Sequence, residues 1–75
     1  MSLAQQWVSV NFPEGTTLHS IATAFIRRYR EGSAAMDGLI IGFEETYTGA
    51  VLTFRDGSKA QFEDLASEIV RVVAK

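Results

Sequence analysis

His19 and Ser20 are the two neighbouring residues whose types could perform nucleophilic catalysis. Such a pair needs a histidine aimed at the hydroxyl group and a third group that orients the histidine. Adjacent residues of a helix point about 100° apart, so these two cannot form that pair with each other. The chain also lacks the Gly-x-Ser-x-Gly turn that presents the serine in many hydrolases. We therefore predict an ordinary surface histidine and a protein that is not an enzyme.

Two acidic pairs, Glu44-Glu45 and Glu63-Asp64, are the remaining candidates for acid/base or metal chemistry. Neighbouring residues of a strand face opposite sides, so Glu44 and Glu45 cannot act together on one proton or one metal ion. The second pair is expected in the first turn of a helix, where negative charge is favourable. With no cysteine and no phosphate-binding glycine spacing, we predict no catalytic site, no metal site and no cofactor.

Arg27, Arg28 and Arg30 form the one basic cluster of the sequence. The forked guanidinium group suits phosphate binding. The whole chain, however, carries a net charge of −2, which is not the basic footprint of a nucleic-acid-binding domain. The cluster is expected in the last turn of a helix, where cations favour the helix dipole. A solvated helix end is our interpretation, and contact with nucleic acid or another anion is the alternative.

The Asp56-Gly57 step lies between two apolar-alternating runs and predicts a β-hairpin. A three-residue loop with Gly57 in the left-handed conformation would pair Leu52 with Ala60 and gather apolar side chains on one face. A two-residue loop would instead place Leu52 on the face of Lys59. Because a slip of one residue flips every side chain, the burial pattern favours the bulged turn.

The same reasoning extends the hairpin to a three-stranded meander. The expected strands cover residues 38–45, 50–55 and 58–62. A four-residue loop between the first two would pair Phe43 with Leu52 and Ile41 with Phe54, apolar side against apolar side.

The segments that flank the meander have their own patterns. Alternation over residues 6–12 predicts a first strand, which Pro13 ends. Apolar residues at helical spacing predict a helix over 17–31. A second apolar helical stripe predicts a helix from 62 to the end of the chain. A strand over 68–73 stays open because the segment is rich in β-branched residues, although Arg71 would then share a face with apolar neighbours.

These elements predict a single α+β domain over residues 1–75. Their order is β-α-β-β-β-α, with a mostly antiparallel four-stranded sheet and two helices on one face, a two-layer architecture. Which edge the first strand joins is open. Phe25, Ile41, Phe54 and Ile69 are expected to be buried together between the two layers.

A chain of 75 residues without cysteines buries a small core, and oligomerisation is a common support for such domains. Trp7, Ile40, Tyr47 and Val51 are expected on the sheet face away from the helices or in a loop, where an apolar patch would mark an interface. We predict a non-catalytic interaction module that forms a homodimer burying about 1,000 Å² or more and binds an unknown macromolecular partner. No membrane-length apolar run or signal peptide is visible, so the expected location is the cytoplasm.

Overall fold

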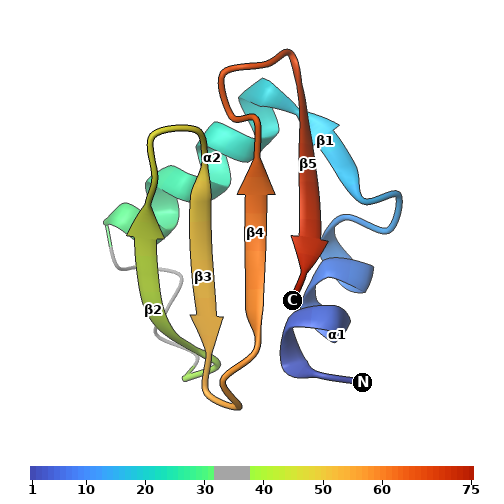
Figure 1. Cartoon of the computed structure of the whole chain (residues 1–75), viewed down its shortest axis with the longest axis vertical. Coiled ribbons are helices and arrows are strands. Elements are labelled where there is room, and N and C mark those ends of the chain that lie inside the picture. Colours follow the sequence, from blue (N-terminus) through green and yellow to red (C-terminus); the bar gives the residue numbers. More distant parts are fainter. Residues whose placement is uncertain (32–37) are drawn as a thin grey trace.

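The computed structural model describes residues 1–31 and 38–75 as a two-layer α+β domain. The elements in chain order are α1 (Leu3–Asn11), β1 (Thr16–Leu18), α2 (His19–Arg30), β2 (Ile40–Glu45), β3 (Ala50–Phe54), β4 (Lys59–Glu63) and β5 (Ile69–Ala74). The strands form one five-stranded sheet in the order β1-β5-β4-β3-β2, and every neighbouring pair is antiparallel. Both helices lie behind this sheet in Figure 1.

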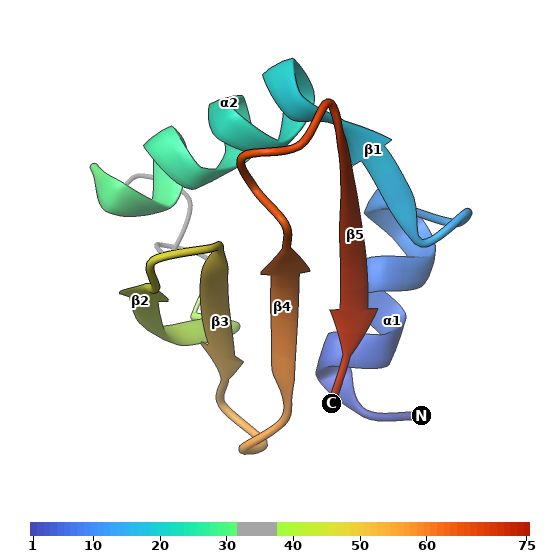
Figure 2. The ribbon, with the colours of Figure 1, turned by 45° about the horizontal axis from the view of Figure 1, so that its top comes forward.

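The fold class is therefore the expected one, but the number and order of the strands are not. The chain runs α-β-α-β-β-β-β and has five strands, whereas the sequence predicted four strands in the order β-α-β-β-β-α. In Figure 2, α2 crosses the upper ends of the strands and α1 lies behind β5. Neither described helix has the length and apolar character needed to cross a membrane.

The segment predicted as a first strand over 6–12 is the helix α1. Its N-cap is Ser2, whose hydroxyl accepts a bond from Gln5 N–H, while the Gln5 side chain accepts one from Ser2 N–H. Ala4, Trp7 and Val8 follow at helical spacing and pack against the sheet. Val10, whose alternation with Val8 indicated a strand, is exposed. The strand prediction was wrong because both periods fit this short segment.

The β3–β4 turn completes the cap of α1 from more than 50 residues away. Asp56 Oδ2 accepts a bond from Leu3 N–H at 2.9 Å, and Ser58 Oγ accepts one from Ala4 N–H at 3.0 Å. Asp56 Oδ1 also accepts bonds from the amide and hydroxyl groups of Ser58. Together with Ser2, these groups bond the first three amides of the helix, which have no partner within it.

We expect this cap to weaken in acid. The bond from Leu3 N–H, followed by the bonds from Ser58, lowers the pKa of Asp56 below its usual value. A carboxyl group whose pKa is lower in the folded state than in the unfolded state stabilises the fold when the pH is above its unfolded-state pKa. This stabilisation is lost as the pH falls through the folded-state pKa. Asp56→Ala should therefore lower the melting temperature at neutral pH and have little effect in strong acid.

Thermal unfolding followed by circular dichroism over an acidic pH series measures that difference. Glu14→Ala, which removes an exposed carboxylate outside the cap, is the matched control. An Asp56→Ala effect that is equally large in strong acid would contradict a role for the charged carboxylate.

The helix predicted over 17–31 is α2, which begins two residues later because Thr16–Leu18 forms β1. Its N-cap, Leu18, provides no side-chain bond. Instead, His19 N–H donates to Glu68 O at 2.9 Å, so the β4–β5 loop supplies a partner for the helix end. The three arginines of the basic cluster lie in the last turn, as expected.

The bulged hairpin is confirmed. Leu52 pairs with Ala60, Phe54 N–H donates to Ser58 O at 2.8 Å, and Gly57 has a φ of +87°, a conformation that an L side chain rarely adopts. The predicted pair of Phe43 and Leu52 is also present.

The start of β2 differs from the prediction. A bulge between Ile40 and Gly42 makes Ile40, not Ile41, the partner of Phe54. One extra residue in a strand reverses the facing of the residues before it. Ile40 is consequently buried, and Ile41 is 67% exposed.

The C-terminal segment is the strand β5 rather than a helix. Val70 and Val72 face the helices and are fully buried, and β5 fills the space between β1 and β4. The turn before it contains Asp64 with a φ of +56°. Its first residue, Ile69, is 52% exposed, so the prediction that Ile69 belongs to the core was wrong.

The core lies between the helices and the inner face of β2–β5. Phe54 is fully buried, as predicted, and Phe25 packs against the core while partly exposed. Trp7 lies at the centre of an aromatic cluster in which its ring centroid is 5.6–6.3 Å from those of Phe12, Phe25, Tyr29, Phe54 and Phe62. The indole ring therefore joins α1 to α2 and to the sheet.

Candidate functional site

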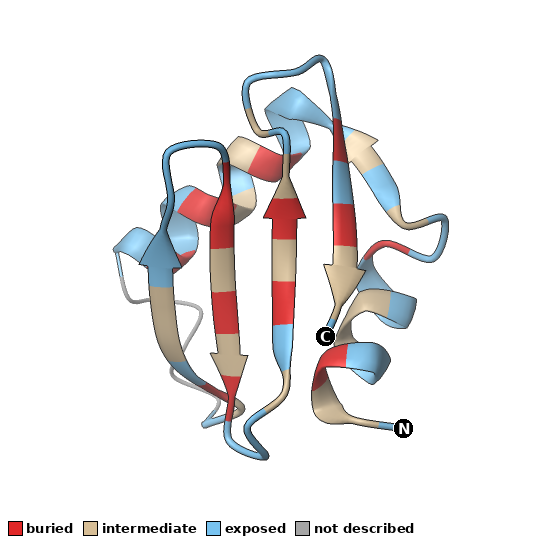
Figure 3. Cartoon of the chain, in the orientation of Figure 1, coloured by how far each residue is buried: buried red, intermediate tan, exposed pale blue. Residues whose placement is uncertain are grey.

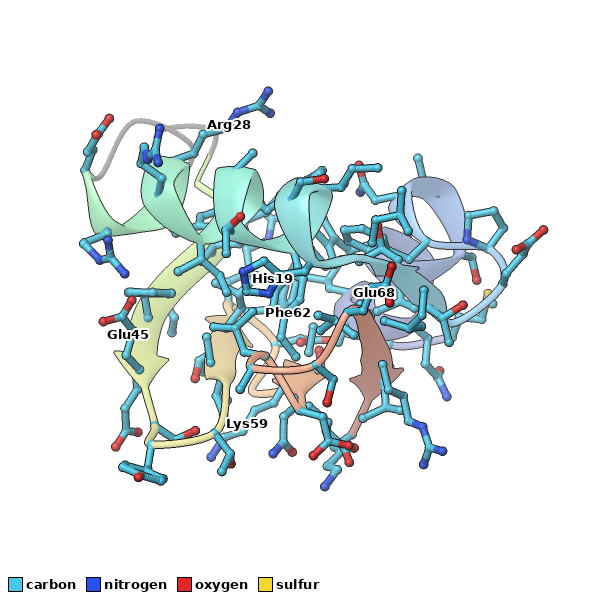
Figure 4. The ribbon with its side chains drawn as sticks, turned by 90° about the horizontal axis from the view of Figure 1, so that it is seen from above. His19, Arg28, Glu45, Lys59, Phe62 and Glu68 are labelled. Carbon is cyan, nitrogen blue, oxygen red and sulfur yellow. The ribbon has the colours of Figure 1, made fainter. Side chains whose placement is uncertain are left out.

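The most distinctive surface is the sheet face that carries no helix, which we call the open face. Figure 1 views the molecule from this side, and Figure 4 shows both helices on the other side of the sheet. Side chains alternate along each strand, so the neighbours of buried residues belong to the open face. These are Leu18 and Thr16 on β1, Glu44 on β2, Val51 and Thr53 on β3, Lys59, Gln61 and Glu63 on β4, and Ile69, Arg71 and Val73 on β5.

A band of partly buried side chains crosses the middle of the open face. The strand register places Glu44, Val51, Gln61 and Val73 side by side on four consecutive strands. All but Glu44 are partly buried, although no helix lies above them (Figure 3). The centre of this face therefore holds two valines on either side of an uncharged glutamine.

An apolar corner adjoins this band where β1 meets β5. Leu18 pairs with Ile69, and the two side chains are 51% and 52% exposed. Single exposed apolar residues are common on protein surfaces. Two large aliphatic side chains that are exposed side by side on neighbouring strands are less common and often mark an interface. Tyr47, in the loop between β2 and β3, is fully exposed at the same end of the sheet.

The open face carries charges of both signs on several strands, and Glu63 on β4 lies directly opposite Arg71 on β5 in the strand register. Glu44 lies on the edge strand β2, whereas Arg71 lies on β5 and Lys75 directly follows that strand. Lys75 and Lys59 exchange two backbone hydrogen bonds, so they lie opposite each other. Among the described residues, the ion pair within 4.0 Å joins Arg30 and Glu45 and involves none of these open-face charges.

The structure changes the set of residues predicted for the interface. Val51 is on the open face and Tyr47 is in an exposed loop, as expected. Trp7 is not on the sheet, because it belongs to α1 and packs in the aromatic cluster. Ile40 faces the helices because of the bulge in β2. These two placements are corrections, and the role of Tyr47 and Val51 in an interface stays a prediction.

The basic cluster is partly engaged by its own chain. Arg30 Nε donates to Glu45 Oε1 at 3.1 Å, and the Arg28 guanidinium lies 5.4 Å from the centroid of the Phe25 ring. Figure 4 shows Arg28 on the helix side of the molecule, away from the sheet. Arg27 is exposed. An anion that bound all three arginines would have to compete with Glu45, so nucleic-acid binding here stays a prediction.

His19 has a structural bond in the fold. Its Nδ1 lies 2.6 Å from Leu65 O, and because a carbonyl only accepts, Nδ1 carries the proton. Together with the His19 amide bond to Glu68, this contact holds the β4–β5 loop against α2, and Figure 4 shows His19 between the helix and the sheet. The described residues contain no group of three metal-binding side chains.

A cavity of about 290 Å³ opens on the helix side between α1 and the ends of β2 and β3. Trp7, Val10 and Phe54 contribute to its apolar wall, and Asn11 is one of its polar residues. The Asn11 amide group donates to Trp7 O at 2.9 Å. No charged side chain of the described residues lines this cavity, so it offers little to orient a ligand.

No family model, curated protein or solved structure shows significant similarity to this chain.

The sequence did not single out Leu18, Ile69, Val73 or Arg71 as surface residues of interest. The C-terminal segment was expected to be a helix, in which the aliphatic residues would have been buried. One signal was present: the strand alternative put Arg71 on the same face as Ile69 and Val73, and the structure has this arrangement.

Proposed function

We propose that this protein is a small non-catalytic interaction module that self-associates through its open sheet face. The observation that carries the proposal is the row of Val51, Gln61 and Val73 beside the exposed pair of Leu18 and Ile69. Residues alternate along such strands between the core and solvent, and those on the solvent-facing side are normally polar. The open face of β5 instead has two aliphatic side chains out of three, which supports a partner that covers it.

The edges of the sheet are less suited to partner binding than the face. β1 has three residues, and β2 carries a bulge together with Glu44 and Glu45. Short edge strands, bulges and charged edge residues are devices that discourage strand addition. A second copy is the simplest occupant of the open face, because one patch then serves both partners of a two-fold dimer.

Val51→Asp should abolish self-association and leave the fold intact. The new carboxylate would be desolvated at the centre of the contact, which costs several kcal/mol without a partner charge. In the monomer the same side chain would be only partly buried and would keep access to water. Sedimentation equilibrium over the micromolar range measures the mass, and circular dichroism checks the fold.

Glu14→Asp, a conservative change at an exposed residue outside the strands, serves as the control for differences in preparation. An unmodified chain that stays monomeric at high micromolar concentration would contradict self-association. A Val51→Asp variant that remains dimeric would show that the contact uses another surface. Binding to a nucleic acid with a steep loss of affinity in salt, removed by Arg27→Ser, would instead favour the alternative function.

A further inference from the structure

From the distribution of charge and apolar groups we infer that two copies pack face to face about a two-fold axis that runs parallel to the strands, between β3 and β4. This inference rests on the proposed self-association and adds its geometry. Such an axis places β4 against β3 of the partner subunit and β5 against β2 of the partner subunit. Two packed sheets with nearly aligned strands are a common arrangement, with about 30° between their directions.

The charges on the open face fit this axis. Val73 and Glu44 lie at the same height along the strands, because both belong to the row that includes Val51 and Gln61. Arg71 and Lys75 lie one side-chain position to either side of Val73 on that face, about 7 Å along the chain. Glu44 of the partner subunit would consequently lie between Arg71 and Lys75, and the symmetry repeats the contact.

The apolar corner fits the same axis independently. The loop joining β2 and β3 lies at the same end of the sheet as the end of β1 and the start of β5 (Figure 1). Because the axis sets β5 against β2 and β4 against β3 of the partner subunit, it brings this loop over the start of β5, where Ile69 lies beside Leu18. Tyr47 of the partner subunit, fully exposed in one chain, would then cover the half-exposed side chain of Ile69 at the edge of the apolar corner.

Two other in-plane axes oppose like charges. An axis perpendicular to the strands through the central row would set Glu44 against its own copy and Arg71 against Lys75. An axis along β4 would set Lys59 and Glu63 each against its own copy. Like charges that face each other across an interface are destabilising, so the axis between β3 and β4 is favoured.

Charge reversal in two separate chains tests this geometry. Glu44→Arg alone would face Arg71 of an identical partner. Arg71→Glu alone would face Glu44 of the partner and would also lie opposite Glu63 of its own chain. Each variant should have a dissociation constant raised about tenfold. An equimolar mixture of the two variants should dimerise about tenfold more tightly than either variant alone, because both contacts between the subunits become complementary. Sedimentation equilibrium measures the dissociation constants, and circular dichroism shows that each variant folds.

A cross-linking experiment tests the geometry without altering these charges. The chain has no cysteine, so Tyr47→Cys and Ile69→Cys each introduce a unique thiol. The proposed axis predicts a disulfide between the two variants when they are mixed under oxidising conditions. Neither variant should cross-link to itself, since each position lies away from its own copy and a disulfide needs Cα atoms within about 7 Å.

The outcomes separate the geometry from the proposed function. Restored dimerisation in the mixture, or the mixed disulfide, supports the axis. The axis is overturned, and self-association is retained, if the unmodified chain is dimeric but the mixture has the same raised dissociation constant as each variant and forms no mixed disulfide. A monomeric unmodified chain overturns both.

Discussion

Gly49→Ala should destabilise the protein by about 3 kcal/mol or more, which approaches the whole stability of a domain of this size. A Cβ on Gly49 would lie 1.9 Å from Phe62 O and 3.0 Å from Phe62 C. Both are backbone atoms of β4, so no rotamer change relieves the overlap. Two bonds fix the backbone on either side, from Thr46 N–H to Gly49 O and from Leu65 N–H to Thr48 O.

Urea unfolding followed by circular dichroism measures this cost. Gly42→Ala is the matched control, because its Cβ would meet the side chain of Thr53 at 3.3 Å, and a side chain can move by the few tenths of an ångström required. The control should cost much less than Gly49→Ala. A Gly49→Ala variant as stable as the control would show that β3 and β4 do not approach so closely at this point.

Trp7→Ala should also bring the chain close to unfolding, with an expected loss of about 3–5 kcal/mol. The indole ring contacts five other aromatic rings, which belong to α2, the sheet and the C-cap of α1. Its removal would leave a cavity where α1 meets α2, next to the existing cavity beside α1. The sequence pattern instead placed Trp7 in an interface patch, where its removal would dissociate a dimer and leave the monomer folded.

Urea unfolding again provides the measurement, with far-UV circular dichroism as the probe because Trp7 is the only tryptophan. Trp7→Phe keeps an aromatic ring in the cluster and should cost clearly less. If Trp7→Ala instead unfolded at the same urea concentration as the unmodified chain and only became monomeric, Trp7 would be an interface residue after all.

Local patterns were sufficient for the middle of the chain. The meander strands, the bulged turn at Gly57 and the pair of Phe43 and Leu52 were all predicted from alternation and turn chemistry. These features connect residues that are close in sequence. A shift of one residue in the pairing of the strands would have placed Phe54 on the solvent-facing side of the sheet. The helix α2 was equally clear, because its apolar residues recur at helical spacing over twelve residues.

The interface prediction failed in part for a related reason. The facing of Ile40 depends on a bulge of one residue, and alternation alone placed Ile41 inside. Val51 was placed correctly because its facing follows from the well-determined hairpin. Residues of the open face on β5 were missed together with β5 itself.

The sequence by itself determined the α+β class, the three meander strands, the register of the β3–β4 hairpin and the helix α2, since each depends on neighbours within a few residues. Only the tertiary structure decided the two ends. The short helix α1 is capped by Asp56 and Ser58, and β5 is a strand because it lies between β1 and β4. In both segments the local preference for helix and strand was nearly balanced, so bonds from distant parts of the chain determined the outcome.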